Sequence, residues 1–257
     1  MSATLQTVGW AQVDERRLLD LTYAFDEHTL AWPGNEPFRW ERAAWGRSES
    51  GNWYAAGNFR MAEHSGTHLD APIHFAEDRQ TLDAIPLHRL IGPAVVMSVA
   101  DQVSADADYR LSVKELLRWE GQHGRIPTGA IVLLHTGWGA RWPDRKRYFG
   151  SETPDDATTL HFPGYSREAA EWLVRERQIR GVGIDTASID YGPSQDFPVH
   201  RVLNTANVYG LENIANLDRV PATGATLIAM PMKIAGGTGG PVRIVVVLPD
   251  GAGRSLP

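Results

Sequence analysis

The sequence contains no cysteine among its 257 residues. This absence excludes disulfide bonds, iron–sulfur clusters, thiolate zinc sites and cysteine nucleophiles. Basic side chains are also in the minority, with 25 lysines and arginines against 31 acidic residues and a formal net charge of −6. Because an excess of positive charge holds a nucleic-acid backbone, this balance argues against general nucleic-acid binding. Because cysteine is absent, any metal ion in this protein must be held by nitrogen and oxygen ligands.

Long apolar runs are missing as well. No stretch approaches the length of a membrane helix, and residues 1–10 lack the basic start and apolar core of a secretory signal. We therefore expect a cytoplasmic enzyme with no membrane partner and a small-molecule substrate.

What the sequence does contain is an alternation of apolar runs with amphipathic, capped segments, which indicates an α/β fold. The runs at 94–100 and 130–135 are bounded by Gly or Pro, as expected of strands buried on both faces. Ser112 is followed three residues later by Glu115, the spacing of a helix capping box. The expected strands are 18–24, 56–62, 94–100, 130–135, 181–184, 226–229 and 242–248, and the expected helices are 112–123, 166–178 and 199–207.

One aromatic and polar segment, residues 38–53, shows no clear period. We interpret it as a surface loop or irregular hairpin that could roof a pocket.

The densest polar cluster holds four candidate metal ligands within eleven residues. On a straight strand its first two histidines would lie about 13 Å apart, too far for one ion. Gly66 and Pro72 argue against a helix, so a bend at Gly66 is the remaining way to bring the ligands together. The alternative is a run of surface or hydrogen-bonded histidines, but four ligand-type residues around such a bend favour a metal site. The four are His64, His68, Asp70 and His74.

The pattern His-x-Gly-Thr-His-x-Asp-x-Pro-x-His over 64–74 resembles the signature of the metal-dependent cyclase family, which includes bacterial kynurenine formamidases and isatin hydrolases. The resemblance extends from about 20 to 248 and implies a single compact α/β domain over 1–257, of the swivelling β/β/α type. Residues 1–17 would then be an N-terminal extension, and the family implies a homodimer or homotetramer. Supporting stretches are 20–22, 32–34, 183–190, 231–233 and 240–243.

The same resemblance implies roles for individual residues. In the formamidases the first two motif histidines and the aspartate bind metal, the aspartate bridges to a second ion, and a later His and Glu twelve residues apart complete that second site. Segment 38–54 is more similar to the longer isatin-hydrolase-like members, some of which hold one manganese instead of two zinc ions. The resemblance thus implies one or two Mn or Zn ions per subunit. The implied metal ligands are His64, His68, Asp70, His200 and Glu212, with His74 in the general acid/base position.

These residue types suit hydrolysis. A divalent ion lowers the pKa of its bound water to about 7 and polarises a carbonyl, so metal-bound hydroxide can attack an amide while His74 protonates the leaving nitrogen. The expected function is cleavage of the C–N bond of a small aryl amide, an isatin-type cyclic amide or N-formylkynurenine. We select Trp53 as the substrate-binding aromatic, with Trp32 and Phe75 as further candidates.

Two alternatives stay open. One is a lactone or imide hydrolase, or a cyclase, of the same family, and the other is a non-catalytic metal-binding homologue. The presence of His74 and Glu212 argues against the second. Asp185 and Asp190 are interpreted as turn and cap residues that support the site, and Gly236–Gly240 as a tight turn near it.

Overall fold

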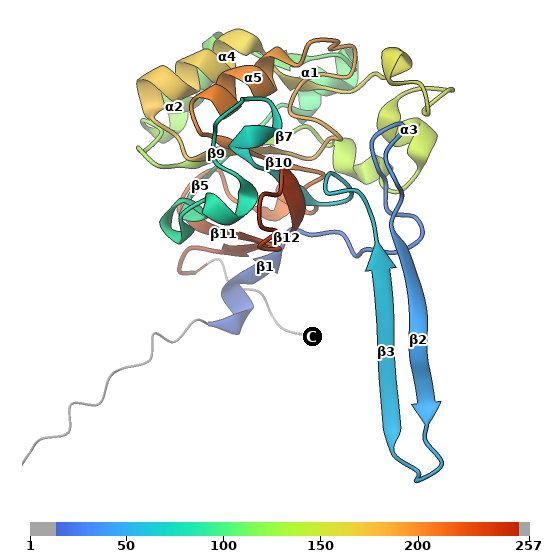
Figure 1. Cartoon of the computed structure of the whole chain (residues 1–257). Helices are drawn as coiled ribbons and strands as arrows, with labels where there is room; N and C mark the ends of the chain where they lie inside the picture. Colours follow the sequence, from blue (N-terminus) through green and yellow to red (C-terminus); the bar gives the residue numbers. More distant parts are fainter. Residues whose placement is uncertain (1–13, 252–257) are drawn as a thin grey trace, which may run out of the picture.

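The centre of the molecule is one eight-stranded sheet, seen in a computed structural model that describes residues 14–251 (Figure 1). Its strands are β1 (Leu18–Asp20), β4 (His68–Asp70), β5 (Ile91–Ser98), β7 (Ile131–His135), β9 (Gly181–Ile184), β10 (Tyr209–Glu212), β11 (Ala225–Pro231) and β12 (Gly239–Val247). They lie in the order β1-β12-β11-β5-β7-β9-β10-β4, and the run β5-β7-β9-β10 is parallel. Because β12 also pairs with β4, the sheet closes on itself as a barrel.

The central strands are buried on both faces, as their apolar runs predict. In β7, Val132 and Leu134 belong to the hydrophobic core beneath the helices, whereas Ile131 and Leu133 belong to the core inside the barrel. The period of two along a strand sends alternate side chains to these two cores. The expectation of α/β architecture in a single compact body is confirmed.

The helices gather over one side of the sheet (Figure 1). They are α1 (Ala100–Ala105), α2 (Val113–His123), α3 (Arg145–Phe149), α4 (Arg167–Trp172) and α5 (Pro198–Thr205). The predicted capping box of Ser112 and Glu115 is present, and Ser166 caps α4. The helix expected over 166–178 is not α-helical throughout, because α4 ends at Trp172 and continues as a π-helical turn over Leu173–Arg177.

A separate two-stranded hairpin, β2 (Arg39–Arg47) and β3 (Trp53–Arg60), projects from the body (Figure 1). The prediction of an irregular hairpin over 38–53 is confirmed, whereas the idea that it roofs the site is wrong, because no residue of 39–60 lines the cavity described below. A register shift between Arg42 and Ala44 hides the strand period from sequence reading, since it adds one residue to β2. A third small sheet joins β6 (Arg110–Leu111) to β8 (Gly164–Tyr165).

Most of the predicted N-terminal extension, 1–17, lies outside the described residues, and its end forms a short 3-10 helix over Glu15–Arg17. Within residues 14–251, no helix is both long and apolar enough to cross a membrane.

Candidate metal centre and active site

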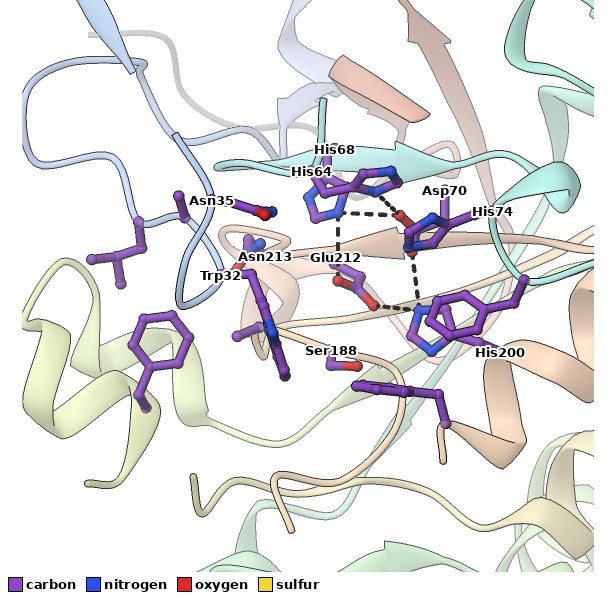
Figure 2. Close-up of a pocket in the computed structure, with 16 residues that line it drawn as sticks. Trp32, Asn35, His64, His68, Asp70, His74, Ser188, His200, Glu212 and Asn213 are labelled. Atoms are coloured by element: carbon purple, nitrogen blue, oxygen red, sulfur yellow. Dashed lines mark hydrogen bonds and ion pairs between the residues drawn. The ribbon is translucent and has the colours of Figure 1, made fainter. Parts of the chain in front are cut away.

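The motif turns at Gly66, whose φ is +58°. This turn brings the ring centroids of His64 and His68 to 5.3 Å. His68 and Asp70 are two residues apart in β4 and share a face, with 3.2 Å between Nε2 and Oδ1. His64 Nδ1 lies 2.6 Å from the same Asp70 oxygen. The predicted bend is therefore confirmed, and it gathers three side chains at one point (Figure 2).

Replacing Gly66 with Ala should destabilise the protein by about 2 kcal/mol. A Cβ at this position would lie 2.7 Å from the Phe25 ring, and the left-handed φ adds strain. The matched control is Gly121→Ala in α2, where nothing lies within 4 Å and alanine should stabilise the helix by about 0.5–1 kcal/mol. Chemical denaturation measures both, and equal unfolding midpoints for the two variants would contradict this view of the bend.

The second half of the cluster comes from α5 and β10. Because β10 runs antiparallel to β4, Glu212 lies directly opposite His68 in the register, with 3.5 Å between Oε2 and Nε2. His200 on α5 reaches the same place, with Nε2 3.2 Å from Glu212 Oε1 and 3.3 Å from Asp70 Oδ2. Residues 130 or more positions apart in the chain thus meet around one aspartate.

His74 closes the motif on the cavity side. It ends a short 3-10 helix that follows β4, and its ring stacks on His64 with centroids 3.8 Å apart. The His200 ring is 5.9 Å away from it. His74 therefore lies beside the cluster and faces the same cavity (Figure 2).

The outer nitrogen of His64 is held by a hydrogen-bond chain. The Thr238 hydroxyl donates to Glu63 Oε2 at 2.6 Å, so it accepts from His64 Nε2 at 2.9 Å. This places the proton of a neutral imidazole on Nε2 and leaves Nδ1 bare toward Asp70. Thr238 lies in the predicted glycine-rich turn, which does pass beside the site.

The other two histidines are oriented in the same way. His68 Nδ1 donates to the Gly66 carbonyl at 2.9 Å, and His200 Nδ1 donates to Asp190 Oδ2 at 2.7 Å. In each ring the free nitrogen is the one that points into the cluster. Partners of this kind on the outer nitrogen are the usual support of metal-binding histidines.

The donor set fits a divalent cation. Three imidazole nitrogens face carboxylate oxygens at 2.6–3.5 Å, a contact that is favourable only when a positive charge, a metal ion or a proton on the ring, lies between them. Asp70 Oδ2 is buried and accepts no hydrogen bond in the described structure. Within residues 14–251, two groups have the reach to hold an ion, and Asp70 belongs to both. They are His64, Asp70 and His74, and His68, Asp70 and Glu212.

The pKa values reflect the same demand for positive charge. Burial alone lowers the pKa of His68, but Asp70 and Glu212 outweigh it and raise that pKa to about 9. Burial also lowers the pKa of His200, but the carboxylates of Asp190, Asp70 and Glu212 outweigh burial. The pKa of His200 is therefore well above its ordinary value. Burial and the Asp70 charge raise the pKa of Glu212. Burial lowers the pKa of His74 to about 3, so that its imidazole is neutral.

The cluster forms one end of a cavity of about 310 Å³. Facing it is an aromatic wall in which Trp32 meets Phe149 and Phe197 edge-on, with centroids 6.5 and 6.0 Å away. Phe75 adds to this wall beside Phe197, at 5.2 Å. The polar side chains at the edge of the cavity are Asn35, Ser188 and Asn213 (Figure 2).

The structure brings six of the seven predicted site residues together, namely His64, His68, Asp70, His74, His200 and Glu212. Trp53 is not among them, because it lies on the projecting hairpin with 58% of its surface exposed. Trp32 and Phe75, the further candidates, do line the cavity. The sequence does not predict the hydrogen bonds that link Glu63, Thr238 and His64, because no pattern near either position indicates that they meet.

Asp190 acts as the cap that was expected of it. Its carboxylate accepts from the backbone N–H groups of Val199 and His200 at the start of α5, at 3.0 and 3.1 Å, and also holds His200 Nδ1. One buried side chain therefore positions both the helix and the imidazole. Its direct contact with His200 was not foreseen.

The Asp190→Asn substitution should weaken metal binding by about 10- to 100-fold, because the amide offers one acceptor oxygen where the carboxylate offers two. Competition with a chromophoric chelator measures the affinity. Asp156→Asn is the matched control, since Asp156 caps only an exposed 3-10 turn and should leave the affinity unchanged. An Asp190→Asn protein with wild-type metal affinity would refute the positioning role.

Comparison with known proteins agrees with this geometry. Residues 19–191 match the cyclase family model, described as "Putative cyclase". The chain is 36% identical over 206 residues to isatin hydrolase from Roseibium aggregatum, covering 77% of this chain and 74% of that enzyme. It is 30% identical over 233 residues to kynurenine formamidase from Salinibacter ruber, covering 89% and 96%. Isatin hydrolase A from Ralstonia solanacearum superposes with a TM-score of 0.83 at 36% identity, covering 90% and 92%.

These relatives are named hydrolases, and a buried cluster of histidines and carboxylates is the kind of site that holds a divalent ion for hydrolysis. In class, this protein is an enzyme, a metal-dependent hydrolase. Because the family model matches more than half of the chain and relatives match across most of it, the chain belongs to the cyclase family.

Proposed function

We propose that this enzyme hydrolyses the C–N bond of a small aryl amide, an isatin-type cyclic amide or N-formylkynurenine. The observation that carries the proposal is the cavity, which has the histidine–carboxylate cluster at one end and an aromatic wall facing it. The names of the relatives, isatin hydrolase and kynurenine formamidase, support both substrates. Water adds to the amide carbonyl, the C–N bond breaks, and the products are a carboxylate and an aryl amine.

The metal ligands in this proposal are His64, His68, Asp70, His200 and Glu212. Their nitrogen and oxygen atoms suit Mn²⁺ or Zn²⁺, with one or two ions per subunit. Asp70 offers both oxygens to the cluster, so it is the residue able to bridge two ions. When bound, such an ion lowers the pKa of water to about 7 and polarises the amide carbonyl.

His74 moves the proton. An amide nitrogen leaves poorly as an anion, so it must receive a proton as the C–N bond breaks. The neutral imidazole of His74 takes the proton that the attacking water gives up and delivers it to the leaving nitrogen. Its stacking on His64 holds the ring next to the cluster without using its own nitrogens.

The aryl ring of the substrate packs against Trp32, Phe75 and Phe197. Edge-on and tilted aromatic contacts are favourable beyond the apolar area that they bury. The polar groups of Asn35 and Ser188 at the cavity edge are available to substrate oxygens. This wall excludes bulk water from the reacting carbonyl.

A substrate panel tests the proposal. The purified holoenzyme is assayed with isatin, N-formylkynurenine, a simple lactone and a cyclic imide, each followed by absorbance and product identification. We expect turnover of at least one of the two aryl amides to exceed that of the lactone and imide. Turnover confined to the lactone or imide would overturn the amide assignment while keeping metal-dependent hydrolysis.

We propose further that the enzyme works as a homo-oligomer, a homodimer or homotetramer, as the family resemblance implies. The cytoplasmic location stays a prediction from the sequence.

A further inference from the structure

The aromatic wall of the cavity is assembled from parts of the chain that are far apart in sequence. Trp32 comes from the segment before the β2–β3 hairpin, whereas Phe149 is the last residue of α3. Both rings line the cavity and meet edge-on. An edge-on contact between two rings is a weak link. The position of the wall therefore depends on what else joins these two parts of the chain.

Arg145 joins them directly. It is the first residue of α3, and its Nη1 donates to the Ala31 carbonyl at 3.2 Å. In Figure 1, α3 accordingly lies next to the segment that leads into β2. Arg145 also reaches Phe149, which is four residues further along the helix and shares its face. The guanidinium carbon lies 4.9 Å from the centre of that ring, in a cation–π arrangement.

These contacts form a closed circuit around the wall. Ala31 precedes Trp32 in the chain, and Trp32 touches Phe149. Phe149 lies beneath the guanidinium of Arg145, which returns to the Ala31 carbonyl. One side chain thus fixes both the backbone next to Trp32 and the ring that Trp32 meets.

The guanidinium is itself held in place. Its Nε and Nη2 donate to Asp155 Oδ1 at 3.2 and 2.8 Å, so each of the three guanidinium nitrogens has an acceptor. The side chain is only 33% exposed. A planar fork of donors can make these contacts at once, whereas the single nitrogen of a lysine cannot. The geometry therefore requires arginine in particular.

The other side of the same segment is attached to the metal-binding motif. The backbone N–H of Gly66 donates to the Leu30 carbonyl at 2.9 Å, and Ala31 pairs with Ser65 in an isolated β-bridge. Residues 30–32 therefore run between the motif and α3. Figure 2 shows Trp32 on the side of the cavity that faces the cluster. The attachment to the motif does not involve Arg145, so the cluster can stay intact when the wall is released.

We propose that Arg145 is a positioning residue for the aryl ring of the substrate. It is not among the residues that line the cavity, and it acts through Trp32 and Phe149. By fixing these two rings it sets the space between the wall and the cluster, in which a flat ring lies with its carbonyl toward the ligands. The inference rests on the proposed function, because only an aryl substrate uses this wall.

The first test separates substrate binding from chemistry. Arg145→Met removes the donors and the charge but keeps an unbranched side chain. We expect it to raise KM for the aryl amide that the panel identifies by about 5- to 10-fold, with kcat and metal content close to the wild type. Arg145→Lys should recover only part of this loss, because it keeps the charge without the fork.

Binding without turnover gives a second measurement on the holoenzyme. The dissociation constant of 2-aminobenzoate, measured by calorimetry, should rise by the same factor in Arg145→Met. Acetate carries the carboxylate without the ring, so its dissociation constant, measured by competition, should not change. These two probes distinguish the aromatic wall from the metal centre.

The position of Trp32 can be followed independently of any ligand. In protein labelled with 5-fluorotryptophan, the ¹⁹F signal that disappears in Trp32→Phe belongs to this residue. Arg145→Met should shift or broaden that signal. Arg167→Met is the matched control, since Arg167 is an exposed arginine of α4 whose Nε lies 2.8 Å from Glu171 Oε1. It should keep the wild-type KM, dissociation constants and Trp32 signal.

The outcomes separate this role from the proposed function. Unchanged KM and 2-aminobenzoate affinity in a folded Arg145→Met protein would overturn the positioning role. A fall in kcat and metal content at unchanged KM would overturn it too, because that pattern indicates a general loss of structure. If the wild type hydrolyses neither aryl amide but binds 2-aminobenzoate in a way that depends on Arg145, the proposed function fails and the positioning role stands. If it neither hydrolyses nor binds these compounds, both are wrong.

Discussion

His74→Ala should reduce kcat by about a hundredfold or more while the protein keeps its metal. The reason is geometric, since His74 faces the cavity and contacts His64 by ring stacking rather than through a ring nitrogen. Without it, the leaving nitrogen loses its proton donor, but the remaining nitrogen and oxygen ligands are intact. Elemental analysis and steady-state kinetics on the same preparation measure the two effects together.

The metal content of the His74→Ala variant distinguishes a proton donor from a metal ligand. His74 also lies close enough to His64 and Asp70 to ligate an ion. A variant that loses both metal and turnover would make His74 a ligand, and one that keeps full kcat would remove it from the mechanism. His123→Ala is the matched control, because His123 is exposed at the end of α2 and should retain both metal and kcat.

Asp70→Asn should abolish stoichiometric metal binding and lower kcat/KM by about a thousandfold or more, because it removes the one charge that the whole cluster shares. The carboxylate lies within 3.3 Å of imidazole nitrogens of His64, His68 and His200. Asparagine keeps the shape of the side chain but places an N–H donor where a cation must lie.

Metal titration by calorimetry and turnover measurements check this expectation. The matched control is Asp101→Asn, an exposed aspartate in the first turn of α1, which should bind metal as the wild type does. If Asp70→Asn retained tight stoichiometric metal and near-normal kcat/KM, the cluster around Asp70 would not be the metal centre.

The sequence predicts the site best where the information is local. The motif of 64–74 contains its own bend, since Gly66 adopts a left-handed φ that residues with a Cβ rarely take. The residue types then leave few ways to arrange His64, His68 and Asp70. His200 and Glu212 are predicted only by family resemblance, because Glu212 reaches the cluster through the pairing of β10 with β4 and His200 through the packing of α5 beside β10.

The features that the sequence does not predict depend on contacts between distant parts of the chain. The Thr238 contact with His64 joins residues 174 positions apart, and nothing in either neighbourhood signals it. Trp53 was selected for the substrate because it lies eleven residues before His64, but it begins β3 beside the turn of the hairpin and does not line the cavity. The wall that faces the cluster instead uses Trp32, which precedes the hairpin.

The central claim is that the cluster around Asp70 holds the divalent ion that drives hydrolysis. The most direct measurement is elemental analysis of the purified protein, with turnover of isatin and N-formylkynurenine followed before chelation, after chelation and after readdition of Zn²⁺ or Mn²⁺. The account predicts one or two ions per subunit, loss of turnover with the metal, and recovery with one of the two ions. A protein that binds neither ion on readdition, or that turns over either amide equally well without metal, would contradict it.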